Sequence, residues 1–496
     1  MKQELNGTEA IDLAARDCRV EARFYVPGYP ITDLARVLEA EISVNEKVAM
    51  EMALGASATG SRSMVIAKQL GMNLLADPLV ISATHTIGAG LMVLVGDDLG
   101  PRGSQAEMDS RYYGLICELP VLDPRDPESL YHSIAEAYSL SERIRAPAIV
   151  RITSRLLSAR GQVDPGLDEL QMQMPHQYFD RSIWKLTAMG RHQRYRREVL
   201  PTIESASEST PLNSIRITDQ VGVIASGYPA RLAEGLGCSL LAMGYANPLP
   251  WNLVQRFIDG HRLVLVAEEP EPLIESQLRM SDKVLGRMTG HLPFGSLSKE
   301  DLSTAIEGIS EDLGKAQIKL KLEPPAPDYE SAREKGHKTI CDGCPFEPLF
   351  AVLGRLDVPV AGDAGCSINS VREPYSSVDM AYGLGSAIGV ASGFKRKGIA
   401  VIGDYALAHS GLQGLINAVW RGKDVLVVVI QNGVAAQTGC QEVPDLTGVL
   451  EALVPMQMLN FPVAEEGIEQ LLRDELAKPG TSMVMAIGRC VMDDRH

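Results

Sequence analysis

Short apolar runs of strand length alternate with longer helical patterns along most of this chain, and this alternation limits the fold more than any other feature. The first runs lie at residues 65–66, 91–95 and 148–152. Strands that alternate with helices build βαβ units, in which the strands run parallel and the helices cover the sheet. We therefore predict an α/β protein with several doubly wound, mostly parallel sheets.

The same rhythm returns in two later parts of the chain. Strands are predicted there at residues 221–225, 239–243, 263–267, 399–402, 425–430 and 482–487. With 496 residues the chain is too long for one hydrophobic core, and usual domain sizes suggest about three or four compact units. We expect a first α/β domain over residues 1–157, a helical connecting segment over 158–215, a smaller α/β domain over 216–322, a Pro-rich linker over 323–337 and a last α/β domain over 338–496.

Charge and hydropathy argue against several classes of protein. The net charge is -16 and no basic stripe stands out, so nucleic acid is not an expected partner. No apolar run approaches the roughly 20 residues that a membrane span needs, and the first residues lack a hydrophobic signal region. We expect a cytoplasmic protein outside the membrane, in which the eight cysteines point to metal or redox chemistry.

Polar oxygen ligands follow two neighbouring predicted strands in the last domain. Gly403 and Asp404 follow the first of these strands, and Asn432 follows the second. Because ligands bind at the carboxyl ends of parallel strands, we expect Asp404 and Asn432 to face one crevice. Together with the backbone carbonyl of Val434 they offer hard oxygen donors suited to Mg²⁺, and a diphosphate would fill the other metal positions.

Plainer explanations compete with this site. Asp404 could cap a helix, and Asn432 could belong to an ordinary Asn-Gly turn. Either half alone would favour those explanations, whereas both halves together, at two strand ends, favour a cofactor site. Their spacing matches the binding motif of thiamine-diphosphate enzymes. Gly383, Gly385 and Gly389 resemble a dinucleotide fingerprint but lack its acidic residue, which indicates close helix packing instead.

Four cysteines of the last domain form a second candidate site. Cys341 and Cys344 are spaced as C-x-x-C, Cys366 lies in Gly-Asp-Ala-Gly-Cys after a predicted strand, and Cys490 follows the last predicted strand. Four thiolates suit a structural zinc ion as well as an iron–sulfur cluster. The spacing alone leaves both metals open.

Several motifs together resemble one known family. They read SVNEKVAMEMALGAS, QAEMDSRYYG, ASGYP, NPLP, VAEEPEP, GRMTGHLP, CDGCP, GDAGC and GDYALAHSGLQGLINA, in chain order. All of them are similar to motifs of the α subunit of indolepyruvate:ferredoxin oxidoreductase, one of the 2-oxoacid:ferredoxin oxidoreductases. The similarity extends over nearly the whole chain.

The resemblance implies a pyrimidine-binding domain first, a transketolase-C-terminal-like domain in the middle and a diphosphate-binding domain last. Thiamine diphosphate would lie across the first and last domains. Glu46, in the Asn-Glu-Lys motif, would contact N1′ of the aminopyrimidine and promote its imino tautomer. Without the resemblance, Glu46 would be interpreted as a surface residue of a helix.

The resemblance also implies further contacts near the cofactor. Thr32, in Gly-Tyr-Pro-Ile-Thr, is a candidate for binding the 2-oxo acid, although it could simply cap a helix. His409 and Ser410 are candidates for contacting the cofactor or a charged intermediate. A buried structural histidine is the competing interpretation of His409.

For the cysteines, the resemblance favours iron over zinc. It implies one [4Fe–4S] cluster near the thiamine ring, held by Cys341, Cys344, Cys366 and Cys490. Cys440 is a rival for the fourth position.

The chain also departs from the family pattern. The family's α subunit continues into a ferredoxin-like module, whereas this chain ends at His496, so we expect a separate ferredoxin-like subunit or another electron acceptor. Arg102 and His85 stand at positions expected to face the substrate and differ from the family residues. Arg102 would either bind a carboxylate through two parallel hydrogen bonds or lie in solvent. Phe346 replaces a family histidine, so indolepyruvate is not assumed as the substrate.

These features predict an enzyme subunit that oxidatively decarboxylates a 2-oxo acid, with thiamine diphosphate, Mg²⁺ and a [4Fe–4S] cluster as cofactors. Coenzyme A would take the acyl product, and ferredoxin or a ferredoxin-like subunit would take the electrons. The expected assembly is a homodimer, or a heterotetramer with a smaller γ-type subunit. One alternative is a non-oxidative thiamine-dependent decarboxylase or carboligase, and another is a non-catalytic, cluster-bearing electron-transfer subunit.

Overall fold

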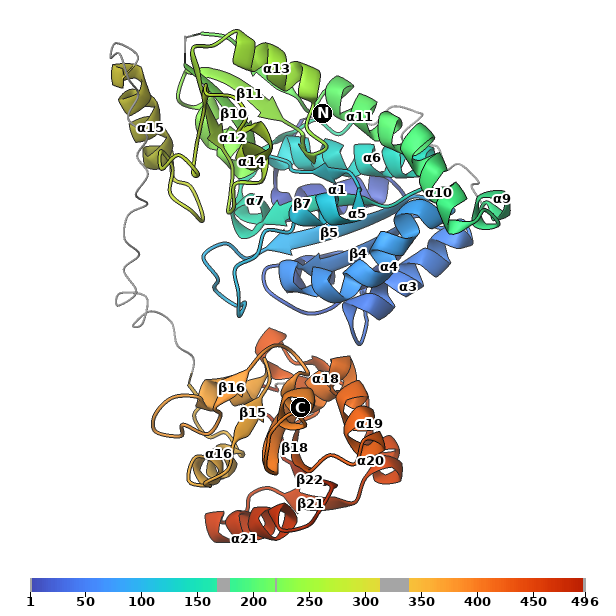
Figure 1. The fold of residues 1–496 in the computed structure, drawn as a ribbon, viewed down its shortest axis with the longest axis vertical. Coiled ribbons are helices and arrows are strands. Elements are labelled where there is room, and N and C mark those ends of the chain that lie inside the picture. The colour runs from blue at the N-terminus through green and yellow to red at the C-terminus, as the bar shows by residue number, and fades with distance from the viewer. Residues whose placement is uncertain (1, 167–178, 219–220, 313–338, 494–496) are drawn as a thin grey trace. The chain divides into compact units, whose positions relative to one another are not determined.

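The computed structural model of this chain describes residues 2–166, 179–218, 221–312 and 339–493. It divides into two compact units, Met1–Pro327 and Asp328–His496 (Figure 1). Each unit is described by itself. The expected linker over 323–337 lies outside the described residues.

A seven-stranded sheet forms the core of the first unit. Its strands, in spatial order, are β12 (Tyr245–Asn247), β6 (Val121–Leu122), β7 (Ala148–Thr153), β5 (Leu91–Asp97), β4 (Ser63–Lys68), β2 (Ala22–Tyr25) and β3 (Glu41–Ile42). All pairs are parallel except that of β12 with β6. Helices α3 (Glu46–Ala58) and α4 (Met72–His85) pack together beside this sheet, as do α1 (Gly7–Asp17) and α6 (Pro127–Ile144).

A second sheet of five strands lies in the same unit. Its order is β14 (Val284–Leu285), β13 (Leu263–Ala267), β10 (Val221–Ser226), β11 (Ser239–Met243) and the antiparallel edge strand β9 (Ser214–Arg216). The chain leaves this sheet after β11, adds β12 to the first sheet and then returns. The two sheets of the first unit therefore share one continuous segment of chain.

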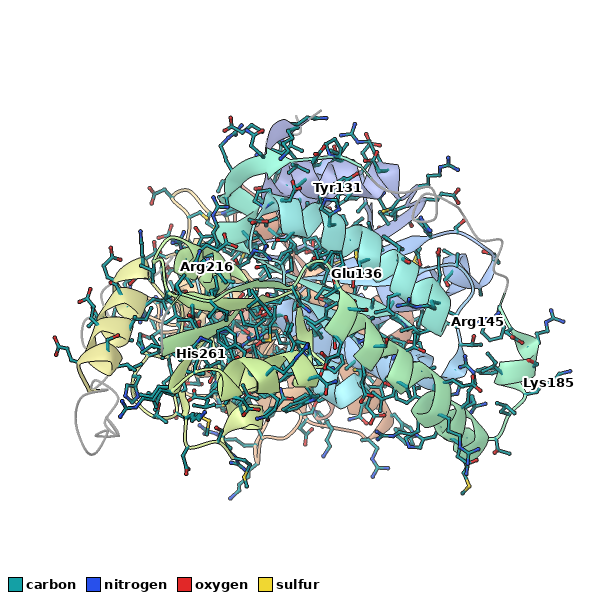
Figure 2. The ribbon with its side chains drawn as sticks, turned by 90° about the horizontal axis from the view of Figure 1, so that it is seen from above. Tyr131, Glu136, Arg145, Lys185, Arg216 and His261 are labelled. Atoms are coloured by element: carbon teal, nitrogen blue, oxygen red, sulfur yellow. The ribbon has the colours of Figure 1, made fainter. Side chains whose placement is uncertain are left out.

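Side chains of α6 hold the segments that lead to the second sheet. Glu136 accepts hydrogen bonds from the hydroxyls of Tyr245 and Thr210, both at 2.6 Å, and Figure 2 shows Glu136 on α6. Arg145, at the end of the same helix, pairs with Asp180 at 2.6 Å. These contacts fix β12 and the helical segment before it on the first sheet.

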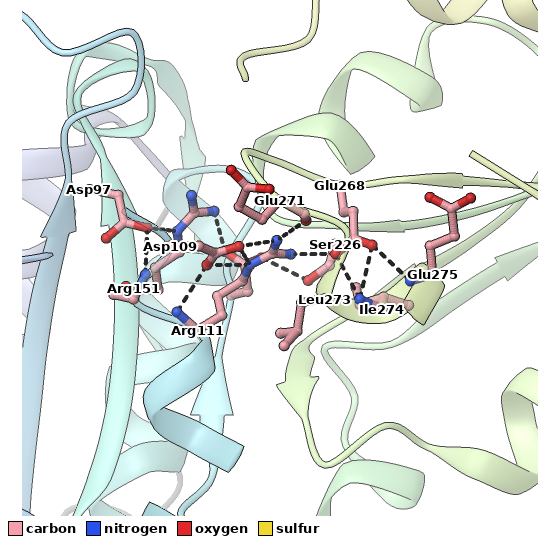
Figure 3. Close-up of polar contacts among 12 residues, drawn as sticks. Asp97, Asp109, Arg111, Arg151, Ser226, Glu268, Glu271, Leu273, Ile274 and Glu275 are labelled. Carbon is pink, nitrogen blue, oxygen red and sulfur yellow. Dashed lines mark hydrogen bonds and ion pairs between the residues drawn. The ribbon is translucent and has the colours of Figure 1, made fainter. Parts of the chain in front are cut away.

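A buried network of charges joins the ends of the two sheets (Figure 3). The Arg111 guanidinium lies 2.6 Å from Asp109 and 3.0 Å from Glu268, which follows β13. Arg151 of β7 pairs with Asp97 at 2.9 Å. All five side chains are at most 1% exposed, so each charge depends on its partners rather than on water.

The second unit contains one parallel sheet of six strands. Its order is β16 (Met380–Ala381), β15 (Val360–Gly362), β17 (Gly398–Gly403), β18 (Val425–Gln431), β22 (Thr481–Ile487) and β21 (Met456–Asn460). Strands β17, β18 and β22 are almost fully buried, as expected where helices cover both faces of a sheet. The carboxyl ends of β15, β17 and β18 are neighbours along one edge.

The predicted fold class is confirmed, because the apolar runs coincide with β4, β5, β7, β10, β11, β13, β17, β18 and β22. The connecting segment predicted to be helical over 158–215 contains the helices α9 (Arg181–Trp184), α10 (Ala188–Arg194) and α11 (Leu200–Ser209), and it also contains short strands. That segment begins with β8 (Arg160–Val163), which pairs with β1 (Gln3–Asn6) near the N-terminus. Both strands are short and polar, so only their long-range pairing defines them.

Candidate functional site

The carboxyl ends of β17 and β18 bring the predicted metal ligands together. Asp404 Oδ2 accepts a hydrogen bond of 2.7 Å from the backbone N–H of Gly433, in the turn that follows Asn432. Asn432 Oδ1 accepts from Val434 N at 3.1 Å. Gly433 has φ +73°, a conformation that glycine adopts without strain, so the Asn-Gly pair permits this turn. The side-chain oxygens of Asp404 and Asn432 thus lie at one turn, where two adjacent strands end.

Burial raises the pKa of Asp404 to about 6, although backbone N–H groups of Gly433 and Tyr405 oppose this shift by donating to the carboxylate. Asp404 and Gly433 also line a cavity of about 240 Å³. Its other lining residues are Leu407, Val429, Gln431, Val443, Pro444, Asp445, Leu446, Thr447, Leu450 and Met485. The partly buried carboxylate therefore faces a space that a ligand can enter.

A second carboxylate at this edge, that of Asp363, was missed by the sequence analysis. Asp363 follows β15, is fully buried and accepts hydrogen bonds from Gly365 N and the Ser367 hydroxyl. Its Oδ2 makes no hydrogen bond within the described residues, and burial raises its pKa to about 6. The signal was present in the sequence, since Gly362-Asp363 repeats the Gly-Asp pair of the neighbouring strand β17.

His409 and Ser410 lie together on the short helix η5 (Leu407–Gly411), and His409 is buried. The Ser410 hydroxyl donates to Leu384 O at 2.8 Å, so His409 Nδ1, 3.1 Å away, is the donor to Ser410 Oγ. A Cβ on Gly385 would lie 2.2 Å from Ser410 Oγ. Of the three upstream glycines, Gly385 thus packs closely beside η5, whereas a Cβ on Gly383 or Gly389 would meet no atom within 4 Å.

The four predicted cluster cysteines lie near one another. A turn with Gly343 at φ +74° carries Cys341 and Cys344. Burial raises the pKa of Cys366 to about 12, and the charges of Cys344, Cys490 and Cys341 add to that rise. Thiols that influence each other in this way lie within electrostatic range.

The rival ligand Cys440 belongs to the same neighbourhood. Its Sγ lies 3.2 Å from Met492 O, and Cys341 Sγ lies 3.9 Å from Met492 Sδ. Cys440 and Cys341 therefore flank the segment that carries Cys490. Across the described ranges, no three His, Cys, Asp or Glu side chains are arranged to hold a metal ion as they stand.

In the first unit, Glu46 begins helix α3 and is only 4% exposed. Asn45 caps this helix by accepting from Val48 N at 2.9 Å. A Cβ on Gly71 would lie 2.3 Å from Glu46 Oε1, so glycine there leaves room for the carboxylate. The buried position of Glu46 differs from that of a typical surface residue of a helix.

Thr32, Arg102 and His85 were also predicted to face the substrate. Thr32 is bonded to its own loop, Arg102 is exposed and His85 packs against an aromatic ring. Thr32 Oγ1 donates to Gly28 O at 3.0 Å and accepts from Gly28 N at 2.8 Å. The side chain of Arg102 is exposed, and its backbone N–H donates to Asp98. His85 packs against Trp184, with ring centroids 5.1 Å apart, at the end of α4 that leads toward the start of β5. The expectation that His85 faces the substrate is therefore not supported within this unit.

Phe346, which stands where the family has histidine, is buried against Phe461 with ring centroids 5.2 Å apart. It contributes to the hydrophobic core of the second unit.

Comparison with known proteins agrees with this geometry. Residues 363–460 match the family model of the thiamine pyrophosphate enzyme, C-terminal TPP binding domain. This range contains Asp363, Asp404 and the turn after β18. The second unit thus contains a domain of the class that binds thiamine diphosphate.

Similarity over the whole chain narrows this class. The indolepyruvate oxidoreductase subunit IorA of Methanothermobacter thermautotrophicus is 30% identical over 95% of this chain and 80% of its own length. The corresponding subunit of Archaeoglobus fulgidus is 30% identical over 89% and 76%. The chain belongs to this family of indolepyruvate oxidoreductase IorA subunits.

One solved structure adds support for the fold alone. The 2-oxoglutarate:ferredoxin oxidoreductase from Magnetococcus marinus aligns with a TM-score of 0.50 and 16% identity, over 62% of this chain and 65% of its own.

Among the described helices, none combines the length and the apolar character needed to cross a membrane.

Proposed function

We propose that this chain catalyses the oxidative decarboxylation of a 2-oxo acid with thiamine diphosphate. The observation that carries this proposal is the contact between Asp404 and the Asn432 turn at two strand ends, inside the range that matches the thiamine-diphosphate family. When bound, thiamine diphosphate supplies the carbon nucleophile that attacks the oxo group.

The chain's own residues would hold and activate the cofactor. Asp404, Asn432 and the carbonyl of Val434 would bind Mg²⁺ through oxygen, and Gly403 would let the diphosphate approach the backbone. Glu46 would hold a proton at N1′ of the pyrimidine ring. Its burial supports this role, because water cannot compete there for a hydrogen bond between the carboxyl group and the ring nitrogen. His409 and Ser410 would border the same site.

Electrons would leave through a [4Fe–4S] cluster on Cys341, Cys344, Cys366 and Cys490. Burial raises the pKa of Cys366 and of Cys344, and the charges of Cys341 and Cys490 add to both shifts. This proximity of charges supports one cluster bound by all four thiols. Coenzyme A would take the acyl group, a ferredoxin or ferredoxin-like subunit would accept the electrons, and a smaller γ-type subunit would complete the assembly. Thr32 and Arg102 remain candidate contacts for the substrate.

The metal assignment is tested with Asp404→Ala and Asn432→Ala. Each substitution removes an oxygen ligand, so the purified variants should contain almost no thiamine diphosphate. Asp424→Ala is the matched control, because Asp424 also accepts a backbone N–H, from Gly480 at 2.6 Å, but precedes β18. Wild-type cofactor content in both ligand variants would contradict the assignment.

The reaction is tested by screening 2-oxo acids with coenzyme A and a viologen dye under anaerobic conditions. Dye reduction that requires both the acid and the subunit is expected. Release of CO₂ without dye reduction would instead identify a non-oxidative decarboxylase.

The cluster is tested by iron and acid-labile sulfide analysis of protein kept free of oxygen. About four irons per chain are expected from the stoichiometry of one [4Fe–4S] cluster. Cys490→Ser should lower this content more than Cys440→Ser, and Cys238→Ser, in the first unit, should leave it unchanged. The reverse order of the first two variants would make Cys440 the fourth ligand, and zinc without sulfide would exclude the cluster.

A further inference from the structure

A lysine at the edge of the first sheet has no part in the mechanism above. Lys68 is the last residue of β4, whose other five residues are all buried. The carboxyl end of β4 lies between those of β5 and β2, the strands that lead into Asp98 and the Gly28 loop. Lys68 therefore stands where ligands bind in parallel sheets.

Several polar side chains surround this position. We define the strand-end cluster as Ser43, Glu46, Lys68, Gln69 and Asp98. Ser43 Oγ and Gln69 Oε1 are buried and make no hydrogen bond within the described parts of the chain. Buried polar atoms in proteins are nearly always paired, so unpaired ones at a strand edge indicate a place for a ligand or ordered water.

The side chain of Lys68 is held tightly along its stem. A Cβ on Gly28 would lie 2.7 Å from Lys68 Cδ and 3.4 Å from Cε, so the stem of the lysine packs directly against the backbone of residue 28. The same glycine bonds to Thr32 through both of its backbone polar groups. The lysine thus runs along the loop that carries Thr32, and its ammonium group is directed by that packing.

The ammonium group lacks a partner of its own. Within the described residues, Lys68 forms no hydrogen bond or ion pair. Asp98 is occupied by the backbone N–H groups of Arg102 and Gly103, at 2.9 to 3.1 Å. Burial lowers the pKa of Lys68, although the charges of Glu46 and Asp98 act to raise it. A partly buried cation without a paired anion favours binding of an anionic ligand.

We propose that Lys68 binds the carboxylate of the 2-oxo acid, an inference that rests on the proposed function. The carboxylate is the charged group that a 2-oxo acid brings to this site. Glu46 lies within electrostatic range of Lys68, so a substrate held by Lys68 would present its oxo carbon near the residue that activates the cofactor. Lys68 is a specificity-determining residue for acids over uncharged carbonyl compounds.

The test compares each 2-oxo acid with its matching aldehyde, for example pyruvate with acetaldehyde and phenylpyruvate with phenylacetaldehyde. An aldehyde loses a proton where the acid loses CO₂, and both yield the same acyl product and two electrons. The aldehyde has no carboxylate for Lys68 to bind. The holoenzyme is assayed as wild type, Lys68→Met, Lys68→Arg and the control Lys47→Met, whose exposed lysine pairs with Asp77 and Glu51.

Lys68→Met should raise KM for the acid by about 10- to 100-fold, the value of one charged hydrogen bond, and change kcat/KM for the aldehyde by less than about twofold. Lys68→Arg should restore most of the affinity for the acid. Equal losses for acid and aldehyde would overturn the proposal and identify Lys68 as a residue that supports Glu46. If the wild-type enzyme turns over none of the 2-oxo acids and none of the aldehydes, the proposed function itself fails.

A second measurement does not depend on turnover. Lysines with a lowered pKa react readily with acylating reagents, so mass spectrometry can follow the acetylation of Lys68 in the intact enzyme. Pyruvate should slow acetylation of Lys68, whereas pyruvamide, which has the same oxo group but no carboxylate, should not, and Lys47 should react at one rate throughout. Absence of protection by every acid that the enzyme turns over would contradict the assignment.

Discussion

Two groups of buried charges lie at the edge of the first sheet, and their cations are held in opposite ways. In the buried network, Arg111 contacts Asp109 and Glu268, and these anions raise the pKa of Arg111 well above its usual value. In the strand-end cluster, burial outweighs nearby anions and lowers the pKa of Lys68. A cation with fixed partners stabilises the fold, whereas a cation without them is available to a ligand.

The largest expected effect is on catalysis in the strand-end cluster. Glu46→Gln should lower kcat by about 10²- to 10⁴-fold, because an amide cannot exchange a proton with the pyrimidine ring. Thiamine diphosphate content should stay at the wild-type level, as measured after denaturation of the purified protein. Full activity in this variant would show that Glu46 belongs with the structural charges.

The next effect concerns stability. Arg111→Met should lower the free energy of unfolding by about 3–5 kcal/mol, because it leaves the carboxylates of Asp109 and Glu268 buried without their counter-ion. Urea unfolding followed by tryptophan fluorescence measures the change. Arg102→Met is the control, since its side chain is exposed, and it should change stability by less than about 0.5 kcal/mol. Similar losses of unfolding free energy in Arg111→Met and Arg102→Met would show that the buried network does not stabilise the fold.

A smaller effect is expected in the pH dependence of substrate binding. Only the protonated lysine attracts a carboxylate, so KM for the acid should rise as the pH rises through the pKa of Lys68, which lies below 10.5. Glu46 from α3 and Asp98 from the loop after β5 oppose this lowering. In Lys68→Arg the rise should move to higher pH, because guanidinium stays charged. An unchanged profile in that variant would assign the titration to another group.

The smallest expected effect is that of Lys68 on stability, which can be compared directly with that of Arg111. Lys68→Met should change the free energy of unfolding by less than about 1 kcal/mol, since it removes a partly buried charge that has no fixed partner. The urea experiment used for Arg111 measures it. A loss as large as that of Arg111→Met would place Lys68 among the structural charges.

The sequence predicts the metal ligands Asp404 and Asn432 better than it predicts Lys68 and Asp363. Asp404 and Asn432 follow long apolar strands, so the position of each at a strand end can be inferred from local pattern alone. Lys68 ends a strand and Asp363 follows one, but their importance depends on burial by residues far away in the chain, such as Gly28 beside Lys68. His85 was assigned to the substrate by position in the sequence, and only packing against Trp184 shows its surroundings.

The short strands were beyond local pattern for a similar reason. Strands β8 and β12 contain four and three residues, too few for a recognisable apolar rhythm. Each exists because a distant partner, β1 or β6, supplies its hydrogen bonds.

The excursion of the chain through β12 limits how this protein can be divided for expression or recombined with relatives. A fragment that ends near residue 215 would lack β12 and leave β6 as an open edge with unpaired backbone groups, which promotes aggregation. A fragment that ends at Pro327 keeps every strand of both sheets. The two sheets of the first unit therefore cannot be exchanged separately between relatives, and the whole first unit is the smallest part that can be.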